Sequence, residues 1–503
     1  MKYRNIIIIA SALALLALSS ACKKEQKAAA YNDFTAESTT VSVPLEGFSE
    51  TAPGVYEFTT TQPWSAKLFK SASWFTFSPA KGEAGKNEIR FTASDNSYGR
   101  TRTATLTIVS GLSTKDITFT QTAHIEGQPW VDWENPVQIA PNPAVYGRVH
   151  RLSDDRLMAC YSTGQDSYIK FSSDEGASWD GAKCIYEHYD TTQAGNNRIV
   201  KIDNPDFAQL SSSNPYKPDR IIYAVNERVR TVDEENPEND DKDAFPYYIS
   251  VLTSDDGGET WSDPVKIYSS SEYAGCYEPF VLELPDGTVQ VYFADETPYA
   301  SASGIGDQNV TVVESTDGGQ TWGTARVASY CKGGRDGMPA ATVYNGNIYL
   351  TVEYRSPAGG EDFHPVVVYN SVSSSWSSPV GDFAEGTPRF DPFQTSLQPA
   401  KYFNGAPYIA QTDNFFLISY QTNRTPSGAT ASNSDLEIQI CPKSEMSGAV
   451  FNTMRSASRP AGIDMTKKYA NWNSISGIGG DTVMAVYCSG GCVYGVKGTV
   501  RNE

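Results

Sequence analysis

The stretch Ser172-Ser-Asp-Glu-Gly-Ala-Ser-Trp179 occurs twice more in this chain, as Thr253-Ser-Asp-Asp-Gly-Gly-Glu-Thr-Trp261 and Ser315-Thr-Asp-Gly-Gly-Gln-Thr-Trp322. Each copy predicts a tight β-hairpin, in which Asp accepts backbone N–H groups of its own turn, Gly supplies positive φ and Trp packs on the sheet. The copies are spaced widely enough for a four-stranded sheet between them, which is typical of radially repeated blades. We therefore predict a β-propeller, with a folding role and no catalytic role for the motif.

Six similar apolar strands recur between residue 130 and the end of the chain, and they predict six blades, with five blades as the alternative. They cover residues 156–161, 220–225, 288–293, 347–352, 415–420 and 481–487. Trp376, in Ser373-Ser-Ser-Trp376, is interpreted as an eroded fourth copy of the hairpin motif. The expected fold is all-β: a six-bladed propeller over residues 130–503, preceded by a small immunoglobulin-like sandwich.

Composition limits the classes of partner. The 503 residues are 39% hydrophobic, with 40 Gly and 28 Pro, which suits a strand-rich protein of one large and one small domain. The net charge of −19 argues against nucleic acid as a partner, because phosphate binding needs a basic face. The acidic stretch 233–243 is interpreted as a solvated loop. Four scattered histidines and no zinc-like cysteine spacing predict neither a metal nor an organic cofactor.

The N-terminus reads as a targeting segment. Lys2 and Arg4 precede an apolar run over residues 6–16 that is too short to span a bilayer comfortably. Leu18-Ser-Ser-Ala-Cys22 follows and resembles a bacterial lipobox, so we expect residues 1–22 to be a lipoprotein signal peptide and Cys22 to be lipidated. Residues 23–34 would be a tether, and the lipid would be the protein's only membrane attachment, at the cell surface or the periplasmic face of the outer membrane.

Export permits disulfides. Seven cysteines remain after Cys22, so at least one is expected to stay a free thiol unless an intermolecular bridge forms. Cys488 and Cys492 are close enough in sequence to close a small loop, and their pairing stays open. We expect a monomer.

Residues 35–123 alternate like half-buried strands and predict a small β-sandwich. The markers Pro63-Trp64, Ser73-Trp74, Ser78-Pro-Ala-Lys-Gly82 and Thr118-Phe-Thr-Gln121 resemble the BACON domain, an immunoglobulin-like module attached to glycan-degrading proteins of Bacteroidetes. We expect a spacer with buried tryptophans. Sugar stacking on Trp64 and Trp74 is the alternative.

Two carboxylates stand out in the propeller region. Glu278 lies in the aromatic segment Gly275-Cys-Tyr-Glu-Pro-Phe280, and Glu353 interrupts the otherwise apolar run Tyr349-Leu-Thr-Val-Glu-Tyr354. Both are predicted at the ends of inner strands of successive blades, which point at the central channel. Glycoside hydrolysis needs one ionised and one protonated carboxyl group across the scissile bond. The alternative for each residue is a carboxylate that is simply paired with an arginine.

The hairpin motif resembles the Asp box of sialidases and related glycosidases. The segments Tyr277-Glu-Pro-Phe280, Gly334-Arg-Asp-Gly-Met-Pro339 and Tyr349-Leu-Thr-Val-Glu-Tyr354 resemble glycoside hydrolase family 93, whose six-bladed exo-α-1,5-L-arabinanases release arabinobiose with retention. The resemblance implies that Glu278 is the nucleophile and Glu353 the acid/base. It also implies an α-linked plant oligosaccharide as substrate, although Tyr277 stands where the family often has Trp.

Two other functions stay open. An exo-α-sialidase needs three arginines, of which Arg148 and Arg335 are candidates, and a tyrosine nucleophile, for which Tyr420 or Tyr487 are the options. A non-catalytic glycan-binding protein is the third interpretation. Arg148 and Arg335 are expected to orient Glu353 or to bind a sugar hydroxyl, with a structural ion pair as the alternative. The predicted substrate-binding residues are Arg148, Tyr277, Arg335, Asp336, Tyr354 and Tyr420.

Overall fold

A computed structural model describes most of the chain beyond its first 32 residues. The described residues are 33–70, 72–94, 96, 101–122, 127–193, 196–231, 246–300, 307–357, 363–384, 386–392, 403–423, 434–446, 456–458 and 470–502. The predicted signal peptide, Cys22 and the acidic stretch 233–243 lie outside them. Among the described residues, no helix has the length and apolar character that crossing a membrane requires.

The chain divides into two compact units. The first nine strands form two sheets, ordered β1-β3-β7-β5 and β2-β9-β8-β4-β6. Their bounds are β1 (Phe34–Thr35), β2 (Thr40–Val43), β3 (Gly54–Thr60), β4 (Trp64–Leu68), β5 (Phe75–Ser78), β6 (Lys81–Gly82), β7 (Gly85–Ala93), β8 (Arg102–Ser110) and β9 (Ser113–Gln121). Alternate side chains of these strands point inward, so the predicted sandwich is present.

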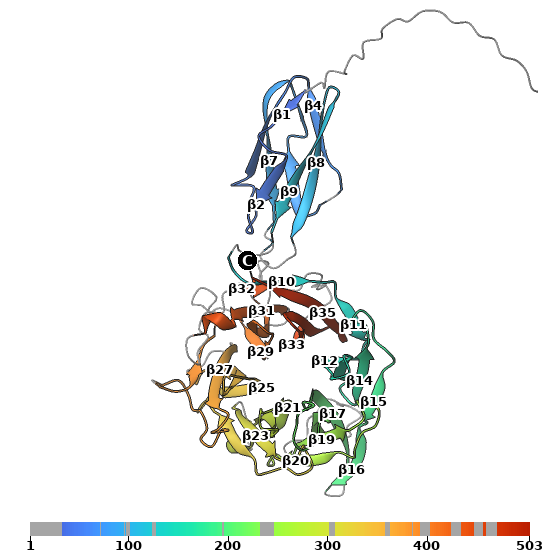
Figure 1. Cartoon of the computed structure of the whole chain (residues 1–503), viewed down its shortest axis with the longest axis vertical. Helices are drawn as coiled ribbons and strands as arrows, with labels where there is room; N and C mark the ends of the chain where they lie inside the picture. Colours follow the sequence, from blue (N-terminus) through green and yellow to red (C-terminus); the bar gives the residue numbers. More distant parts are fainter. Residues whose placement is uncertain are drawn as a thin grey trace, which may run out of the picture. The chain divides into compact units, whose positions relative to one another are not determined.

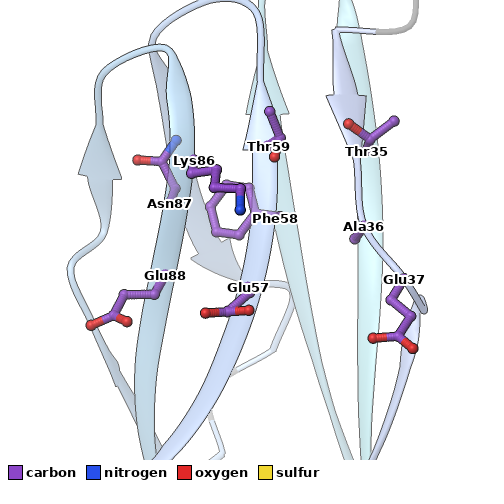
Figure 2. A pocket seen from close by; sticks show the side chains of 9 residues that line it. All are labelled: Thr35, Ala36, Glu37, Glu57, Phe58, Thr59, Lys86, Asn87 and Glu88. Atoms are coloured by element: carbon purple, nitrogen blue, oxygen red, sulfur yellow. The ribbon is translucent and has the colours of Figure 1, made fainter.

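The sandwich core buries one of its two tryptophans. Trp64 is 4% exposed and meets the ring of Phe58 edge-on, with the ring centroids 4.8 Å apart. Trp74 is partly exposed and packs against Phe75. A hollow of about 460 Å³ lies where the chain leaves β1 beside β3, and its one aromatic lining residue is the buried Phe58. Figure 2 shows the side chains that line it. This hollow therefore presents no exposed aromatic face on which a sugar can stack.

Six further sheets surround one axis, as the ring in Figure 1 shows. Blade 1 contains β12 (Val145–Arg151), β13 (Leu157–Ser162), β14 (Ser167–Ser172) and β15 (Lys183–Tyr186), and blade 2 contains β16 (Tyr189–Gln193), β17 (Asn196–Gln209), β18 (Ile221–Thr231), β19 (Tyr248–Ser254) and β20 (Val265–Ser269). Blade 3 contains β21 (Cys276–Glu283), β22 (Val289–Asp295), β23 (Asn309–Ser315) and β24 (Arg326–Ser329), with the 3-10 turn η1 (Thr297–Tyr299) between β22 and β23.

The remaining blades follow the same order. Blade 4 contains β25 (Arg335–Tyr344), β26 (Asn347–Arg355), β27 (His364–Ser371) and β28 (Arg389–Phe390), and blade 5 contains β29 (Asn404–Gln411), β30 (Phe415–Thr422), β31 (Asp435–Pro442) and β32 (Ser456–Ser458), with the 3-10 turn η5 (Lys443–Glu445). Blade 6 joins β33 (Asn471–Gly479), β34 (Thr482–Ser489) and β35 (Cys492–Arg501) to β10 (Trp130–Trp133) and β11 (Val137–Ala140). β10, at the start of the propeller, pairs with β35, at its end, so the first and last strands of the propeller share blade 6 and close the ring.

The three repeated motifs form the predicted hairpins between the last two strands of blades 1 to 3, which are β14–β15, β19–β20 and β23–β24. In blade 2, Asp256 accepts the N–H of Thr260 at 2.9 Å and the hydroxyl of Ser254 at 2.8 Å, and Gly257 and Gly258 have positive φ. Trp376 occupies the corresponding hairpin of blade 4, is 1% exposed and donates its indole N–H to the Tyr292 hydroxyl.

The six apolar strands found in the sequence are β13, β18, β22, β26, β30 and β34, each of which pairs with the strand that lines the axis in its blade (β12, β17, β21, β25, β29 and β33) and is called the second strand below. Six blades are therefore confirmed. One expectation needs correction, because Glu353 lies near the end of a second strand, β26, and not on an innermost strand. Since neighbouring strands are antiparallel, the end of β26 lies beside the start of β25, so Glu353 still reaches the axis.

The seven cysteines after Cys22 are free thiols in the described structure. Cys488 and Cys492 flank the hairpin between β34 and β35 without forming a bond.

Candidate active site at the propeller axis

Each innermost strand carries a β-bulge at the same place, near its start. In every blade two residues of the innermost strand oppose one residue of the second strand, and the first of the two has a positive φ of between 44° and 59°. We call these six residues the bulge ring: Tyr146, Asn204, Glu278, Met338, Ala406 and Trp472. Such conformations cost roughly 1 kcal/mol or more per residue and are common where a side chain must be re-aimed at a functional site. Glu278 is the only charged member of the ring.

The axis beneath the bulge ring is filled. Two residues further along four of the innermost strands lie Arg148, Asp206, Phe280 and Tyr408. The Tyr408 hydroxyl donates to Asp206 at 3.2 Å, and its ring centroid is 5.5 Å from that of Phe280. The Arg148 guanidinium lies 5.2 Å from the Tyr408 ring centroid. Side chains from blades 1, 2, 3 and 5 therefore meet on the axis.

Glu278 has an incompletely paired carboxyl group. Its Oε2 atom is buried and lacks a hydrogen-bond partner, while the main-chain N–H of Met338 in blade 4 donates to the carboxyl group. Burial raises the pKa of Glu278 to about 7, the nearby Glu353 charge also raises it, and Arg335 and Arg228 oppose the rise. The group is thus suited to hold a proton near neutral pH.

Glu353 has a different environment, in which both oxygens are engaged. Nη2 of Arg335 lies 2.9 Å from Oε2, and the main-chain N–H of Ala406 donates to Oε1 at 2.9 Å. The residue is 4% exposed. A Cβ on Gly405 would lie 2.8 Å from Oε1, so glycine gives the carboxylate its room. The charge-assisted pair holds Glu353 as an anion.

In blades 5 and 6 a neutral side chain makes the contact that Glu353 makes in blade 4. Each accepts the main-chain N–H of the bulge-ring residue in the next blade. In blade 5, Oε1 of Gln421 accepts the N–H of the next bulge residue, Trp472, at 3.0 Å. In blade 6, Sγ of Cys488 accepts the N–H of the next one, Tyr146, at 3.1 Å. These side chains occupy the same position of their second strands as Glu353. A neutral acceptor is therefore enough to hold a bulge, and the charge of Glu353 is not needed for that purpose.

Tyr146 covers Arg148 at the centre of the ring. Tyr146 packs against Met338 and Ala406 from blades 4 and 5, and its ring centroid is 3.8 Å from the guanidinium carbon of Arg148. Burial raises the pKa of Tyr146, as do the charges of Glu278 and Asp206, while Arg148 opposes the rise. Arg148 itself is 3% exposed, and its Nη1 donates to the carbonyls of Gly147 and Trp472. The structure thus places Arg148 beneath the ring, where it supports the backbone.

Asp336 does not have the predicted exposure to a substrate. Both of its oxygens accept hydrogen bonds from Arg389, at 3.0 and 2.5 Å, and neither side chain is exposed. Side chains alternate along β25, so Asp336 points away from the side on which Arg335 meets Glu353. Its role in this structure is a buried ion pair between the strands of blade 4.

The predicted tyrosines each contact neighbouring side chains of the propeller. Tyr277 is partly exposed, donates to Glu296 at 3.3 Å and lies under Arg228. Tyr354 is 6% exposed and donates to Asp382 at 3.3 Å. Tyr420 is 3% exposed and donates to Glu437 on the neighbouring strand. Tyr487 is 2% exposed and stacks on Tyr494. Tyr420 and Tyr487 are thus each held by a contact within their own blade.

Three residues at the axis were not found from the sequence. Arg228 donates to Asn204 of the ring at 3.1 Å, Asp206 accepts from Tyr408, and Trp472 is 40% exposed. A signal for the ring was present in the sequence, since a proline follows four of its six members, as in Asn204-Pro205 and Met338-Pro339. Within the described part of the chain, no cluster of three His, Cys, Asp or Glu residues is arranged to hold a metal ion.

Fold and site together define a six-bladed β-propeller in which Glu278 and Arg335, at the start of innermost strands, lie near Glu353, at the end of the neighbouring strand β26. Residues 35–124 match the family described as viral BACON domain. No curated protein matches the chain. The chain therefore carries a BACON domain followed by a propeller.

Solved structures share the propeller fold. An α-L-arabinofuranosidase mutant from Fusarium graminearum, in complex with an iminosugar inhibitor, is 15% identical with a TM-score of 0.50, over 73% of this chain and 98% of that one. A protein of unknown function from Dyadobacter fermentans is 14% identical with a TM-score of 0.52, over 75% and 100%. A Hadza microbial sialidase is 10% identical with a TM-score of 0.46, over 91% and 97%. For the Fusarium and Dyadobacter proteins, the likeness at these identities shows the fold alone.

Proposed function

We propose that this protein is a retaining, exo-acting glycoside hydrolase whose substrate is an α-linked plant oligosaccharide, with linear α-1,5-L-arabinan as the specific case. The observation that carries the proposal is the charge of Glu353. The position needs only a neutral acceptor, as Gln421 and Cys488 illustrate, yet it holds a carboxylate paired with Arg335 beside Glu278. Two carboxyl groups of opposite protonation preference are the minimal apparatus for hydrolysis of a glycoside.

The filled axis supports action at a chain end. Because Arg148, Asp206, Phe280 and Tyr408 meet beneath the ring, a sugar chain cannot continue along the axis past the two carboxyl groups. The exposed Trp472 offers an aromatic face for a sugar ring at the same end of the propeller. The fold shared with an arabinofuranosidase supports arabinan over other α-linked substrates.

Sialidase action has less support. Its tyrosine nucleophile must reach the substrate, whereas Tyr420 and Tyr487 are buried among neighbouring strands. We also propose that the lipobox-like Cys22 anchors the protein to the outer membrane, with the sandwich as a spacer.

The test is product analysis of the chain without residues 1–22, incubated with linear α-1,5-arabinan and with sialyllactose. Wild type is expected to release short arabinose products, and Glu353→Gln to lower that rate by at least about 10³-fold while keeping its Tm. The matched control is Glu272→Gln, an exposed residue just before β21, which should act like wild type. Release of sialic acid, or no release from arabinan, would refute the arabinanase proposal.

A further inference from the structure

Two aromatic side chains border Glu353 at the end of the propeller where the innermost strands begin. Phe403 lies just before β29, and a Cβ on Gly405 would lie 2.7 Å from its Cζ and 2.8 Å from Oε1 of Glu353. Phe363, just before β27, meets Phe403 edge-on with the ring centroids 5.9 Å apart, and lies 5.1 Å from the guanidinium carbon of Arg335. Both phenylalanines are half-buried, so each keeps part of its surface accessible beside the carboxyl group.

The row of rings continues toward the outer strands of blade 4. His364 follows Phe363 and meets Tyr354 edge-on with the ring centroids 5.0 Å apart. Tyr354 in turn meets Phe383 edge-on, at 5.4 Å. Burial lowers the pKa of His364 to about 4, so its ring is uncharged near neutral pH. Phe383 lies between β27 and β28 and is 45% exposed, so the row ends on accessible aromatic surface.

A second exposed ring lies at this outer end. Tyr330 follows β24 of blade 3 and is 36% exposed, and a Cβ on Gly381, two residues before Phe383, would lie 3.1 Å from its hydroxyl oxygen. The buried Arg389 donates from Nη2 to the Tyr330 carbonyl at 3.2 Å and from Nε to the Gly381 carbonyl at 2.9 Å. The main chain beneath both rings is therefore held in place, which lowers the entropic cost of binding a ligand there.

We call these six side chains the aromatic band: Phe403, Phe363, His364, Tyr354, Phe383 and Tyr330. Five of them lie at the starts of β27 and β29 or at the ends of β24 and β26, and Phe383 contacts one of the five. Because neighbouring strands are antiparallel, these positions share one end of the propeller, the end at which Glu278 and Glu353 lie. The band therefore leads outward from the candidate active site across blade 4.

We infer that the aromatic band binds the part of a polysaccharide chain that lies beyond the bond being cleaved, so that long chains are preferred over short oligosaccharides. The inference rests on the proposed function, whose substrate it narrows to long chains. Since side chains fill the axis beneath the bulge ring, a chain whose end lies between the two carboxyl groups has to leave over a blade. Aromatic rings bury the apolar faces of sugars, and the band begins beside Glu353, so blade 4 is that path.

The outer rings test the inference, because only a long chain reaches them. The double variant Tyr330→Ala with Phe383→Ala, checked for folding by thermal melts, should raise KM for linear α-1,5-arabinan about fivefold to twentyfold. Its KM for α-1,5-arabinotriose and its kcat on both substrates should stay within about twofold of wild type. Tyr330→Phe with Phe383→Tyr keeps both rings and should restore the wild-type KM for arabinan.

A matched control removes an exposed tyrosine at the other end of the propeller. Tyr216 lies in the connection from β17 to β18 and is 46% exposed. Tyr216→Ala should leave KM for arabinan and for arabinotriose unchanged. An equal rise of KM for both substrates in the double variant would overturn the inference, since the band would then act without regard to chain length.

Binding to the inactive Glu353→Gln protein separates the inference from the proposed function. Isothermal titration should show α-1,5-arabino-octaose binding about tenfold more tightly than arabinotriose, and adding Tyr330→Ala and Phe383→Ala should reduce this ratio to within about twofold. Equal affinities with the band intact would overturn the inference and leave the proposed hydrolase in place. Failure of the wild-type protein to cleave arabinan would instead overturn the proposed function, whatever the affinities.

Discussion

Arg335 and Glu353 form an ion pair across the first two strands of blade 4, with Nη2 and Oε2 2.9 Å apart and side chains 18% and 5% exposed. The two residues are not directly opposite each other in the pairing of β25 with β26, where Arg335 lies opposite Arg355 and Glu353 lies opposite Gly337. Glycine at position 337 leaves room for the guanidinium, because a Cβ there would lie 2.8 Å from its Nε. Local backbone geometry therefore permits this contact beside Glu278.

Stability should depend on pH through Glu278. The pKa of Glu278 is about 7 in the folded chain and near 4.5 in the unfolded chain. Below pH 4.5 the carboxyl group is protonated in both states, and its contribution to stability is fully present. That contribution is lost as pH rises through 7, because the folded chain must then bury a charged carboxylate. Glu278→Gln removes this dependence. The Tm of the variant minus that of wild type should therefore be greater at pH 8 than at pH 4.5, and an equal difference at both values would show that the pKa is not raised.

Asp336 should affect stability and not substrate binding. Asp336→Asn leaves the buried Arg389 without its counter-charge, and breaking such pairs typically costs about 3–5 kcal/mol. Denaturant unfolding measures that loss, while KM for arabinan at a temperature where the variant is folded should stay within about twofold of wild type. A large rise in KM with unchanged stability would restore the predicted substrate contact.

The hairpin motif should act through its aspartate. Hydrogen bonds from Thr260 and Ser254 lower the pKa of Asp256 to about 2, so its contribution is present above pH 4 and is lost as pH falls toward 2. Asp256→Ala should lower the Tm at pH 6 by roughly 1–3 °C, as the loss of a cap-like hydrogen bond does, and by less at pH 2.5. Product release by the folded variant should be unchanged, and any specific loss of kcat would argue against a purely structural motif.

Trp472 should contribute to binding of the sugar chain. Its main chain is held by Gln421 and Arg148 while its side chain is 40% exposed at the start of blade 6. Trp472→Ala should raise KM for arabinan about fivefold to tenfold, the equivalent of roughly 1 kcal/mol of lost contact, with kcat within twofold. Trp472→Phe keeps an aromatic face and should restore most of the affinity. Equal KM in all three proteins would exclude the contact.

The fold was largely predictable because its signals are local. The Gly and Asp residues of the hairpins and the six apolar second strands are periodic in sequence, and the structure has the same six repeats. Placing Glu353 on an innermost strand was wrong because periodicity identifies a buried strand without giving its rank in the sheet. Only the pairing of β26 with β25 shows that its end returns to the axis.

The partners of the site residues were less predictable. Arg335 and Asp336 are adjacent in sequence, but alternation sends one to Glu353 and the other to Arg389. The surroundings of Glu278 depend on Met338 from the next blade and Arg228 from the previous one. Such contacts are set by closure of the ring, which no short stretch of sequence encodes.

The most direct test of the central claim is the anomeric configuration of the first product, followed by ¹H NMR while wild-type protein acts on linear α-1,5-arabinan. A pair of carboxyl groups acting as nucleophile and acid/base predicts that the α-anomer of a short arabinose product appears first and that the β-anomer grows only by mutarotation. First appearance of the β-anomer, or no arabinose product at all, would contradict the account.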